Sequence, residues 1–175
     1  MIYKINFKKG LKKQFILLLL IIVLTGCKKS ISKENNNKLE QKIESVYQIS
    51  NDTLQVSIKS FGAELTSIQH NSKEYIWQGN PDFWKHQSPT LFPIVGRLVN
   101  HEYQLKGKTY KMNFHGFAWK NNFKLTQKTQ QSITLELSST KETKKQYPYN
   151  FVLKIKYTLR GNKLDVNYNV INPSL

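Results

Sequence analysis

Cysteine and arginine are two of the residue types that this sequence has least of. The single cysteine, Cys27, excludes a disulfide bond within the chain. Only two arginines, Arg97 and Arg160, stand against twenty-five lysines. A rigid guanidinium fork matches a carboxylate or a pair of hydroxyl groups better than an ammonium group does. Because Arg97 lies in an apolar segment with proline and glycine, residues 91–98, we interpret it as a candidate binding residue.

Acidic residues are also few, and the chain is strongly basic. Eleven Asp and Glu face 27 Lys and Arg, which gives a formal charge of +16. Five of the lysines lie before residue 27 with no acid among them, and the others are scattered along the chain. No arginine-rich stripe and no nucleic-acid reader motif accompanies them. The charge therefore indicates a lysine-rich solvated surface, and nucleic acid is not an expected partner.

Long hydrophobic runs are missing, apart from ten apolar residues at 15–24. This run is too short to span a bilayer and follows a lysine-rich start, which is typical of a secretory signal peptide. It ends at Leu-Thr-Gly-Cys27, which resembles the lipobox of bacterial lipoproteins. The resemblance implies that Cys27 is lipidated and that several acyl chains anchor the protein to a membrane of the bacterial cell envelope. The alternative is a buried cysteine that ends a short apolar helix.

The rest of the chain divides by composition. Residues 28–42 are polar, with three asparagines at their centre, and show no apolar periodicity, as in a flexible tether. From Val46 onward, apolar residues recur with a period of two. We therefore expect a signal peptide at 1–26, a polar tether at 27–45 and one folded domain at 46–175.

Helical periodicity is missing from the folded part, and short strand-like runs take its place. Alternating or apolar runs bounded by turn residues predict strands. Residues 82–85 fit a single helical turn, with Phe83 and Trp84 packing inward. The pattern predicts an all-β fold, a sandwich of antiparallel sheets. The expected strands are 54–58, 63–68, 74–77, 103–105, 109–112, 123–127, 133–137, 151–159 and 164–171.

Four segments, in order and at plausible spacing, resemble the aldose 1-epimerases (galactose mutarotase-like proteins). They are Phe-Gly-Ala-Glu-Leu at 61–65, Tyr-Ile-Trp-Gln-Gly-Asn at 75–80, the segment 88–98 with Phe-Pro-Ile-Val-Gly-Arg, and His-Gly-Phe-Ala at 115–118. The resemblance, from about residue 54 to 175, implies the N-terminal part of a β-supersandwich. It also implies interconversion of the α and β anomers of a free aldohexose such as galactose or glucose. No metal or organic cofactor is expected.

The resemblance also implies roles for three residues. Arg97 matches a substrate-binding arginine, and His115 matches the first of two active-site histidines, which binds sugar hydroxyls and helps to polarise the ring oxygen. Trp119 stands where relatives often carry arginine, which argues against a phosphorylated sugar. Its indole offers an aromatic face for a sugar ring, or simply for packing. Without the resemblance, His115 reads as an ordinary loop histidine and Arg97 as a structural arginine that bonds carbonyl groups.

The family's second histidine, its usual general acid, and its glutamate base lie beyond an Asn-Pro turn that here is Asn172-Pro173. Neither is present in this sequence. Each missing proton-transfer group costs about two to four orders of magnitude in rate. We therefore expect this chain alone to be a poor catalyst, with a C-terminal half as a possible partner. The alternative function is a membrane-anchored carbohydrate-binding module or an inactive remnant.

For the other histidines and aromatic residues, the sequence predicts only whether they lie near a cleft or in the core. His86 is the histidine most expected to border a cleft, and no metal-ligand spacing is present. Four aromatic residues are expected to belong to the core rather than to a sugar-binding platform: Trp77, Phe83, Trp84 and Phe92.

Overall fold

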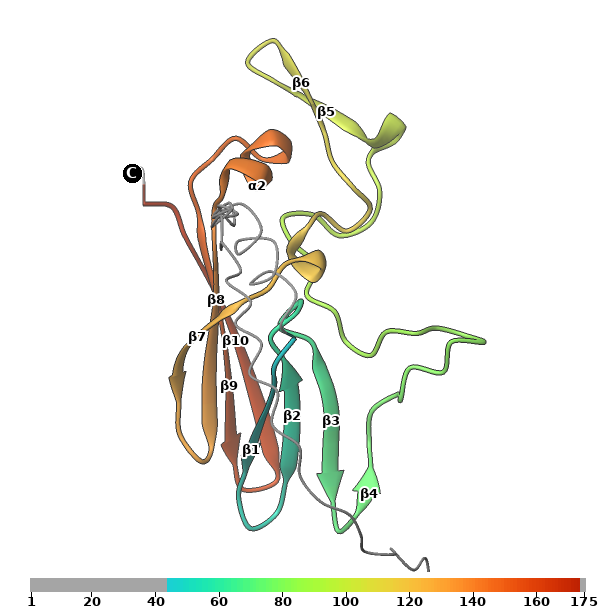
Figure 1. Cartoon of the computed structure of the whole chain (residues 1–175), viewed down its shortest axis with the longest axis vertical. Helices are drawn as coiled ribbons and strands as arrows, with labels where there is room; N and C mark the ends of the chain where they lie inside the picture. Colours follow the sequence, from blue (N-terminus) through green and yellow to red (C-terminus); the bar gives the residue numbers. More distant parts are fainter. Residues whose placement is uncertain (1–43, 174–175) are drawn as a thin grey trace, which may run out of the picture.

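The computed structural model describes residues 44–173. In this part, two four-stranded antiparallel sheets pack face to face, and a two-stranded hairpin extends beyond them (Figure 1). The predicted all-β sandwich is confirmed. The expected signal peptide, Cys27 and the tether up to residue 43 lie outside the described residues. Among residues 44–173, none of the helices has the length and apolar character needed to cross a membrane.

The first sheet has the order β1-β2-β3-β4. Its strands are β1 (Val46–Ser50), β2 (Gln55–Lys59), β3 (Leu65–His70) and β4 (Lys73–Glu74). The predicted strand at 74–77 is wrong beyond Glu74. The Tyr75 N–H still donates to the Ile68 carbonyl of β3 at 2.9 Å, whereas the Ile76 N–H donates to the Glu74 carboxylate at 3.0 Å, and regular pairing ends at Glu74.

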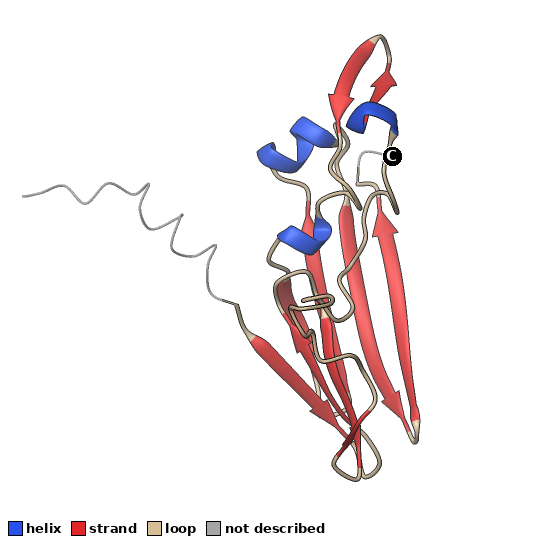
Figure 2. Ribbon diagram, turned by 90° about the vertical axis from the view of Figure 1, so that its right-hand side faces the viewer, coloured by secondary structure: helices blue, strands red, loops and turns tan. Residues whose placement is uncertain are grey.

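The second sheet has the order β10-β9-β8-β7. Its strands are β7 (Lys124–Lys128), β8 (Ser132–Ser138), β9 (Val152–Arg160) and β10 (Lys163–Ile171). The two long strands, β9 and β10, pair without a bulge from Arg160↔Lys163 to Val152↔Ile171. A two-residue turn joins them. Seen from the side, both sheets run along the same long axis (Figure 2).

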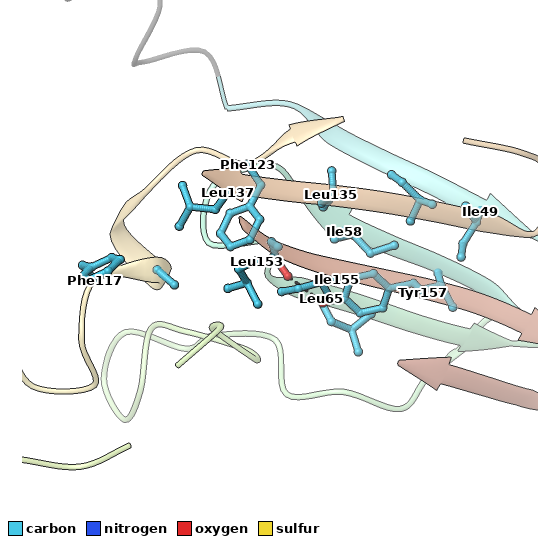
Figure 3. Packing of buried hydrophobic residues seen from close by; sticks show 14 of the residues in the cluster. Ile49, Ile58, Leu65, Phe117, Phe123, Leu135, Leu137, Leu153, Ile155 and Tyr157 are labelled. Carbon is cyan, nitrogen blue, oxygen red and sulfur yellow. Dashed lines mark hydrogen bonds between the residues drawn. The ribbon is translucent and has the colours of Figure 1, made fainter. Parts of the chain in front are cut away.

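The core lies between the facing sides of the two sheets (Figure 3). Alternate residues of β2 and β9 point into it, as the period-two pattern predicted. Burial of each large aliphatic side chain contributes about 1.5–3 kcal/mol relative to its exposure. Fully buried members include Ile49, Val56, Ile58, Ile133, Leu135, Leu153, Ile155 and Leu159.

In the sequence between β4 and β7, the chain forms a hairpin of β5 (Glu102–Leu105) and β6 (Lys108–Lys111). This hairpin was predicted. Two 3-10 helices flank the hairpin, η1 (Val99–His101) and η2 (Ala118–Lys120). The rings of Tyr103 and Tyr110 stack across it with their centroids 5.6 Å apart. The hydroxyl of Tyr103 donates to the Gln146 carbonyl at 2.8 Å, which ties the hairpin to the body of the domain.

One α-helix, α2 (Lys141–Gln146), was not expected. The side chain of Thr140 accepts the N–H of Thr143 at 3.1 Å, and the side chain of Thr143 accepts the N–H of Thr140 at 2.8 Å. This reciprocal cap supports the first turn. Six residues are too few for a helical period to show in the sequence, which is why this helix was missed.

Three of the four aromatic residues expected in the core are not there. Phe83 is 81% exposed, and Trp77 and Trp84 are also exposed. Residues 81–83 do form a turn, but Phe83 packs edge-on against Trp77 on the outside of the domain, with the ring centroids 6.3 Å apart. Only Phe92 joins the core, with its ring 5.1 Å from that of Phe151.

Candidate active site

A cavity of about 380 Å³ lies between two loop segments beside the sandwich. Its volume falls within the range typical of small-molecule sites. The first loop segment contributes Trp84, His86, Gln87, Ser88, Pro89 and Leu91, and the second contributes Phe114, His115 and Trp119. The prediction that His86 borders a cleft is confirmed. Within the described residues, the lining contains two imidazoles and no carboxylate.

His115 is held by the backbone of Gly96. The Gly96 N–H donates to Nδ1 of His115 at 2.9 Å, and the His115 N–H donates to the Gly96 carbonyl at 2.8 Å. Because Nδ1 accepts a hydrogen bond, the proton of the neutral ring lies on Nε2. A histidine at φ 61° is in the left-handed region, which few side chains adopt without such support. His115 therefore presents a hydrogen-bond donor of fixed orientation at the cavity wall.

The loop after His115 crosses close to Phe92. The Phe92 carbonyl accepts the N–H groups of Phe117 at 2.9 Å and Ala118 at 3.2 Å. A Cβ atom on Gly116 would lie 2.2 Å from that same carbonyl oxygen, and Gly116 has φ 73°. Only glycine fits a left-handed position so close to another backbone. Two of the segments that resemble the family, residues 88–98 and 115–118, are thus joined by main-chain contacts.

Arg97 lies beside Phe114 rather than in the cavity lining. Its Cζ atom is 5.5 Å from the centroid of the Phe114 ring, a cation–π distance. The Phe114 ring is in turn 3.7 Å from the imidazole of His115. The structure brings Arg97 and His115 to one corner, with Phe114 between them. Arg97 is exposed, and its binding role stays a prediction.

Trp119 also lines the cavity. Its ring meets His86 edge-on at 5.5 Å, and the Lys120 ammonium lies 4.4 Å from its centroid. Its Nε1 is buried and has no hydrogen-bond partner among the described residues. Trp119 therefore lines the cavity, with one ring face shared with a lysine.

Glu64 fixes the first loop segment to the sheet. Its side chain is buried, and its carboxylate accepts the Gln87 N–H at 2.7 Å. The sequence did not single out Gln87, Ser88, Pro89, Leu91 or Phe114 as site residues. Segment 88–98 belonged to the family resemblance, and Phe114 precedes the key histidine, but only the folded loops show that these side chains face one cavity.

Comparisons with known proteins agree with this fold. The aldose 1-epimerase family profile matches residues 45–174. Chromosomal protein LacX of Lactococcus lactis subsp. lactis is 34% identical over 131 residues, which is 71% of this chain and 44% of LacX.

Two solved structures are also similar. A galactose mutarotase related enzyme from Lactobacillus acidophilus is 42% identical, with a TM-score of 0.72 over 73% of this chain and 43% of that one. A galactose mutarotase-like protein from Lactobacillus casei is 34% identical, with a TM-score of 0.72 over 73% and 44% of the two chains. The present chain thus spans less than half the length of these relatives. It belongs to the aldose 1-epimerase family.

Proposed function

We propose that this chain supplies a sugar-binding wall of an aldose 1-epimerase, which interconverts the α and β anomers of a free aldohexose such as galactose or glucose. The observation that carries the proposal is the imidazole of His115, which Gly96 holds at the cavity wall with its Nε2–H as a donor. Family membership and the mutarotase descriptions of the solved relatives support the substrate class.

Anomer exchange requires two proton transfers. A base removes the proton of the anomeric hydroxyl while an acid protonates the ring oxygen, so that the C1–O5 bond breaks and C1 becomes an aldehyde. Rotation about C1–C2 and the reverse steps give the other anomer. We assign to His115 the binding of a sugar oxygen and the polarisation of the ring oxygen, because a positioned N–H donor stabilises charge that develops there.

Arg97 and Trp119 complete this assignment. The Arg97 guanidinium is suited to a pair of sugar hydroxyls, and it lies beside Phe114, which lines the cavity. Trp119 limits the width of the site. The general acid and base belong, in this proposal, to polypeptide equivalent to the part of the relatives that this chain does not cover.

Mutarotation of α-D-galactose and α-D-glucose, followed by polarimetry, tests the assignment. The full chain in detergent is mixed with the portion of the Lactobacillus acidophilus relative that it does not cover. We expect faster mutarotation, reduced about a hundredfold by His115→Gln. His101→Gln is the matched control, because His101 is exposed and is not among the cavity residues. A folded complex without acceleration contradicts the proposal.

A second function, sugar binding without turnover, is favoured by the absence of a carboxylate from the described cavity lining. Calorimetric titration of the chain alone with galactose or glucose tests it. Heats that vanish in Arg97→Ala and persist in Arg160→Ala support binding at this site. Arg160 is the matched control because it is the other arginine and pairs with Asp165 at 3.3 Å, on an exposed hairpin.

We also propose that the protein is anchored in the bacterial cell envelope through a lipid on Cys27. The apolar run at 15–24 and the Leu-Thr-Gly-Cys sequence support this localisation. Metabolic labelling with a fatty acid is the test, followed by detergent phase partition. Label and partition into the detergent phase should both be lost in Cys27→Ala and kept in Ser30→Ala. A Cys27→Ala variant that still carries the label contradicts the anchor.

A further inference from the structure

His86 lines the cavity of the candidate active site, and the fold itself makes no use of its ring nitrogens. In the described part of the chain, neither nitrogen takes part in a hydrogen bond. By contrast, Nδ1 of His115 accepts the Gly96 N–H at 2.9 Å, and Nδ1 of His70 lies 2.8 Å from the Thr53 carbonyl. The His86 side chain is only partly buried. Its hydrogen-bonding capacity is therefore left for a ligand in the cavity.

Two hydrogen bonds fix the backbone on either side of His86. The indole N–H of Trp77 donates to the Trp84 carbonyl at 2.6 Å, before His86 in the sequence. The Gln87 N–H, directly after it, donates to the buried carboxylate of Glu64 at 2.7 Å. The position of the imidazole is thus set by the protein, without help from a ligand.

Two tryptophan rings confine the imidazole of His86. Its ring centroid lies 6.1 Å from that of Trp84 and 5.5 Å from that of Trp119, at interplanar angles of 65° and 86°. Such edge-on packing limits the rotamers that the ring can adopt. Both tryptophans also line the cavity, so the contacts that orient His86 keep it at the cavity wall.

His86 and His115 offer different hydrogen-bonding groups to one ligand. The Nδ1 atom of His115 is occupied by Gly96, so neutral His115 has only its Nε2–H donor left. Neutral His86 offers one donor and one acceptor. A sugar hydroxyl both donates and accepts, and therefore needs an acceptor in the wall as well as a donor. Gln87 and Ser88 are the other acceptor side chains of the described lining, and the imidazole nitrogen is the most basic of the three.

We propose that His86 is a second sugar-binding residue, which accepts a hydrogen bond from one hydroxyl group of the sugar that His115 contacts. His86 then determines specificity, because the site selects aldohexoses in which that hydroxyl is present and unsubstituted. A site built to bind a hydroxyl rejects an analogue without it, since the polar group of the protein is left unpaired. The inference rests on the proposed function for the class of ligand.

Calorimetric titration of the full chain in detergent with galactose and with glucose measures the contribution of His86. His86→Leu removes both ring nitrogens and should raise the dissociation constant about fivefold, as expected for one lost hydrogen bond. His86→Gln keeps a side-chain acceptor and should recover part of this loss. His101→Leu is the matched control and should bind as the wild type does, because His101 is exposed and outside the cavity lining. Equal melting temperatures will show that the variants fold.

Monodeoxy analogues of the sugar that binds, each lacking a different hydroxyl, test for direct contact with His86. One of them should bind the wild-type chain about fivefold more weakly than the parent sugar. In His86→Leu, this analogue and the parent sugar should bind equally well, because the two changes remove the same interaction. A purely structural role of His86 would weaken the binding of all these sugars alike.

Equal sugar binding by the wild type and His86→Leu overturns the inference and leaves the proposed function standing. The inference also fails if every analogue keeps its full penalty in His86→Leu. If sugar binds only in the mixture used for polarimetry, the same variants and analogues are compared there through KM. If neither the chain nor the mixture binds sugar, both proposals fail. Binding that depends on His86 without faster mutarotation upholds the inference and refutes the catalytic proposal.

Discussion

Gly96 and His115 bind each other through two hydrogen bonds of opposite direction, one from each backbone N–H group. The glycine donates to Nδ1 at 2.9 Å, and the histidine donates to the glycine carbonyl at 2.8 Å. The two residues lie nineteen positions apart in the sequence, and their hydrogen bonds fix both the position and the tautomer of the imidazole. This relationship is the physical basis of the role proposed for His115.

The tautomer can be measured directly, and His70 provides an internal control. The Nδ1 of His70 lies 2.8 Å from the Thr53 carbonyl, an acceptor, so that nitrogen carries the proton. Long-range proton–nitrogen NMR spectra should show neutral His115 as the Nε2–H form and neutral His70 as the Nδ1–H form. If neutral His115 is found in the Nδ1–H form, its Nδ1 does not accept the hydrogen bond from the Gly96 N–H group.

Gly116→Ala should strongly destabilise the domain. The added Cβ would lie 2.2 Å from the Phe92 carbonyl oxygen at a left-handed φ of 73°. We expect a loss of about 3 kcal/mol or more in the free energy of unfolding, measured with urea. Gly107→Ala is the control, because Gly107 has φ 75° but no heavy atom within 4 Å of the added Cβ. Its cost should be about 1 kcal/mol, and equal losses refute the close contact.

Tyr157→Phe tests a hydrogen bond that joins the two sheets inside the core. The Tyr157 hydroxyl, on β9, donates to the Ala63 carbonyl at 2.8 Å, just before β3. Burial raises the pKa of this hydroxyl far above its usual value, so it stays a donor at any ordinary pH. Its removal leaves a carbonyl without that donor and should cost about 1–2 kcal/mol of unfolding free energy. Tyr168→Phe, on the exposed face, should change stability by less than about 0.5 kcal/mol.

Glu74 should make the domain less stable in acid. Burial pushes the pKa of its carboxyl upward, but hydrogen bonds from Ser67, Ile68, Ile76 and Tyr75 outweigh burial and place it below 4.5. A pKa that is lower in the folded state gives stability that is complete above the unfolded value and is lost as the pH falls through the folded value. Urea unfolding should therefore show a decline below about pH 4.5.

Glu74→Gln should remove part of that acid dependence. Glu102→Gln is the matched control, because Glu102 is an exposed glutamate outside the two sheets of the sandwich. An identical decline in all three proteins shows that other carboxyl groups cause it.

The positions of β2, β8 and β9 were predictable because one face of each of these strands is buried, whereas β1 was not among the expected strands. In β9, the alternation from Leu153 to Leu159 already separated the core face from the solvent face. The helix α2 was not predictable from periodicity because it is a single capped segment, and the regular pairing of β4 ends at Glu74, whose carboxylate accepts the N–H group of Ile76. Both outcomes depend on local polar contacts rather than on hydrophobic pattern.

The candidate site was predictable only in part. Arg97 and His115 stood out through composition and family resemblance, and His86 was expected at a cleft. The cavity lining also includes Gln87 and Phe114, which depend on how two irregular loops cross, and no periodic pattern encodes such a path. For the same reason Phe83 and Trp84 were misplaced: a loop aromatic becomes core only if another element happens to cover it.

The hairpin of β5 and β6 has a consequence for protein engineering. The chain leaves the site after Gly96, forms the hairpin and returns at His115, and the two hydrogen bonds between these residues close its base. A second closure, from the Met112 N–H to the His101 carbonyl at 2.8 Å, lies further out. The turn at Lys106-Gly107 is therefore an insertion point, where a fluorescent reporter can be grafted while the imidazole keeps its place.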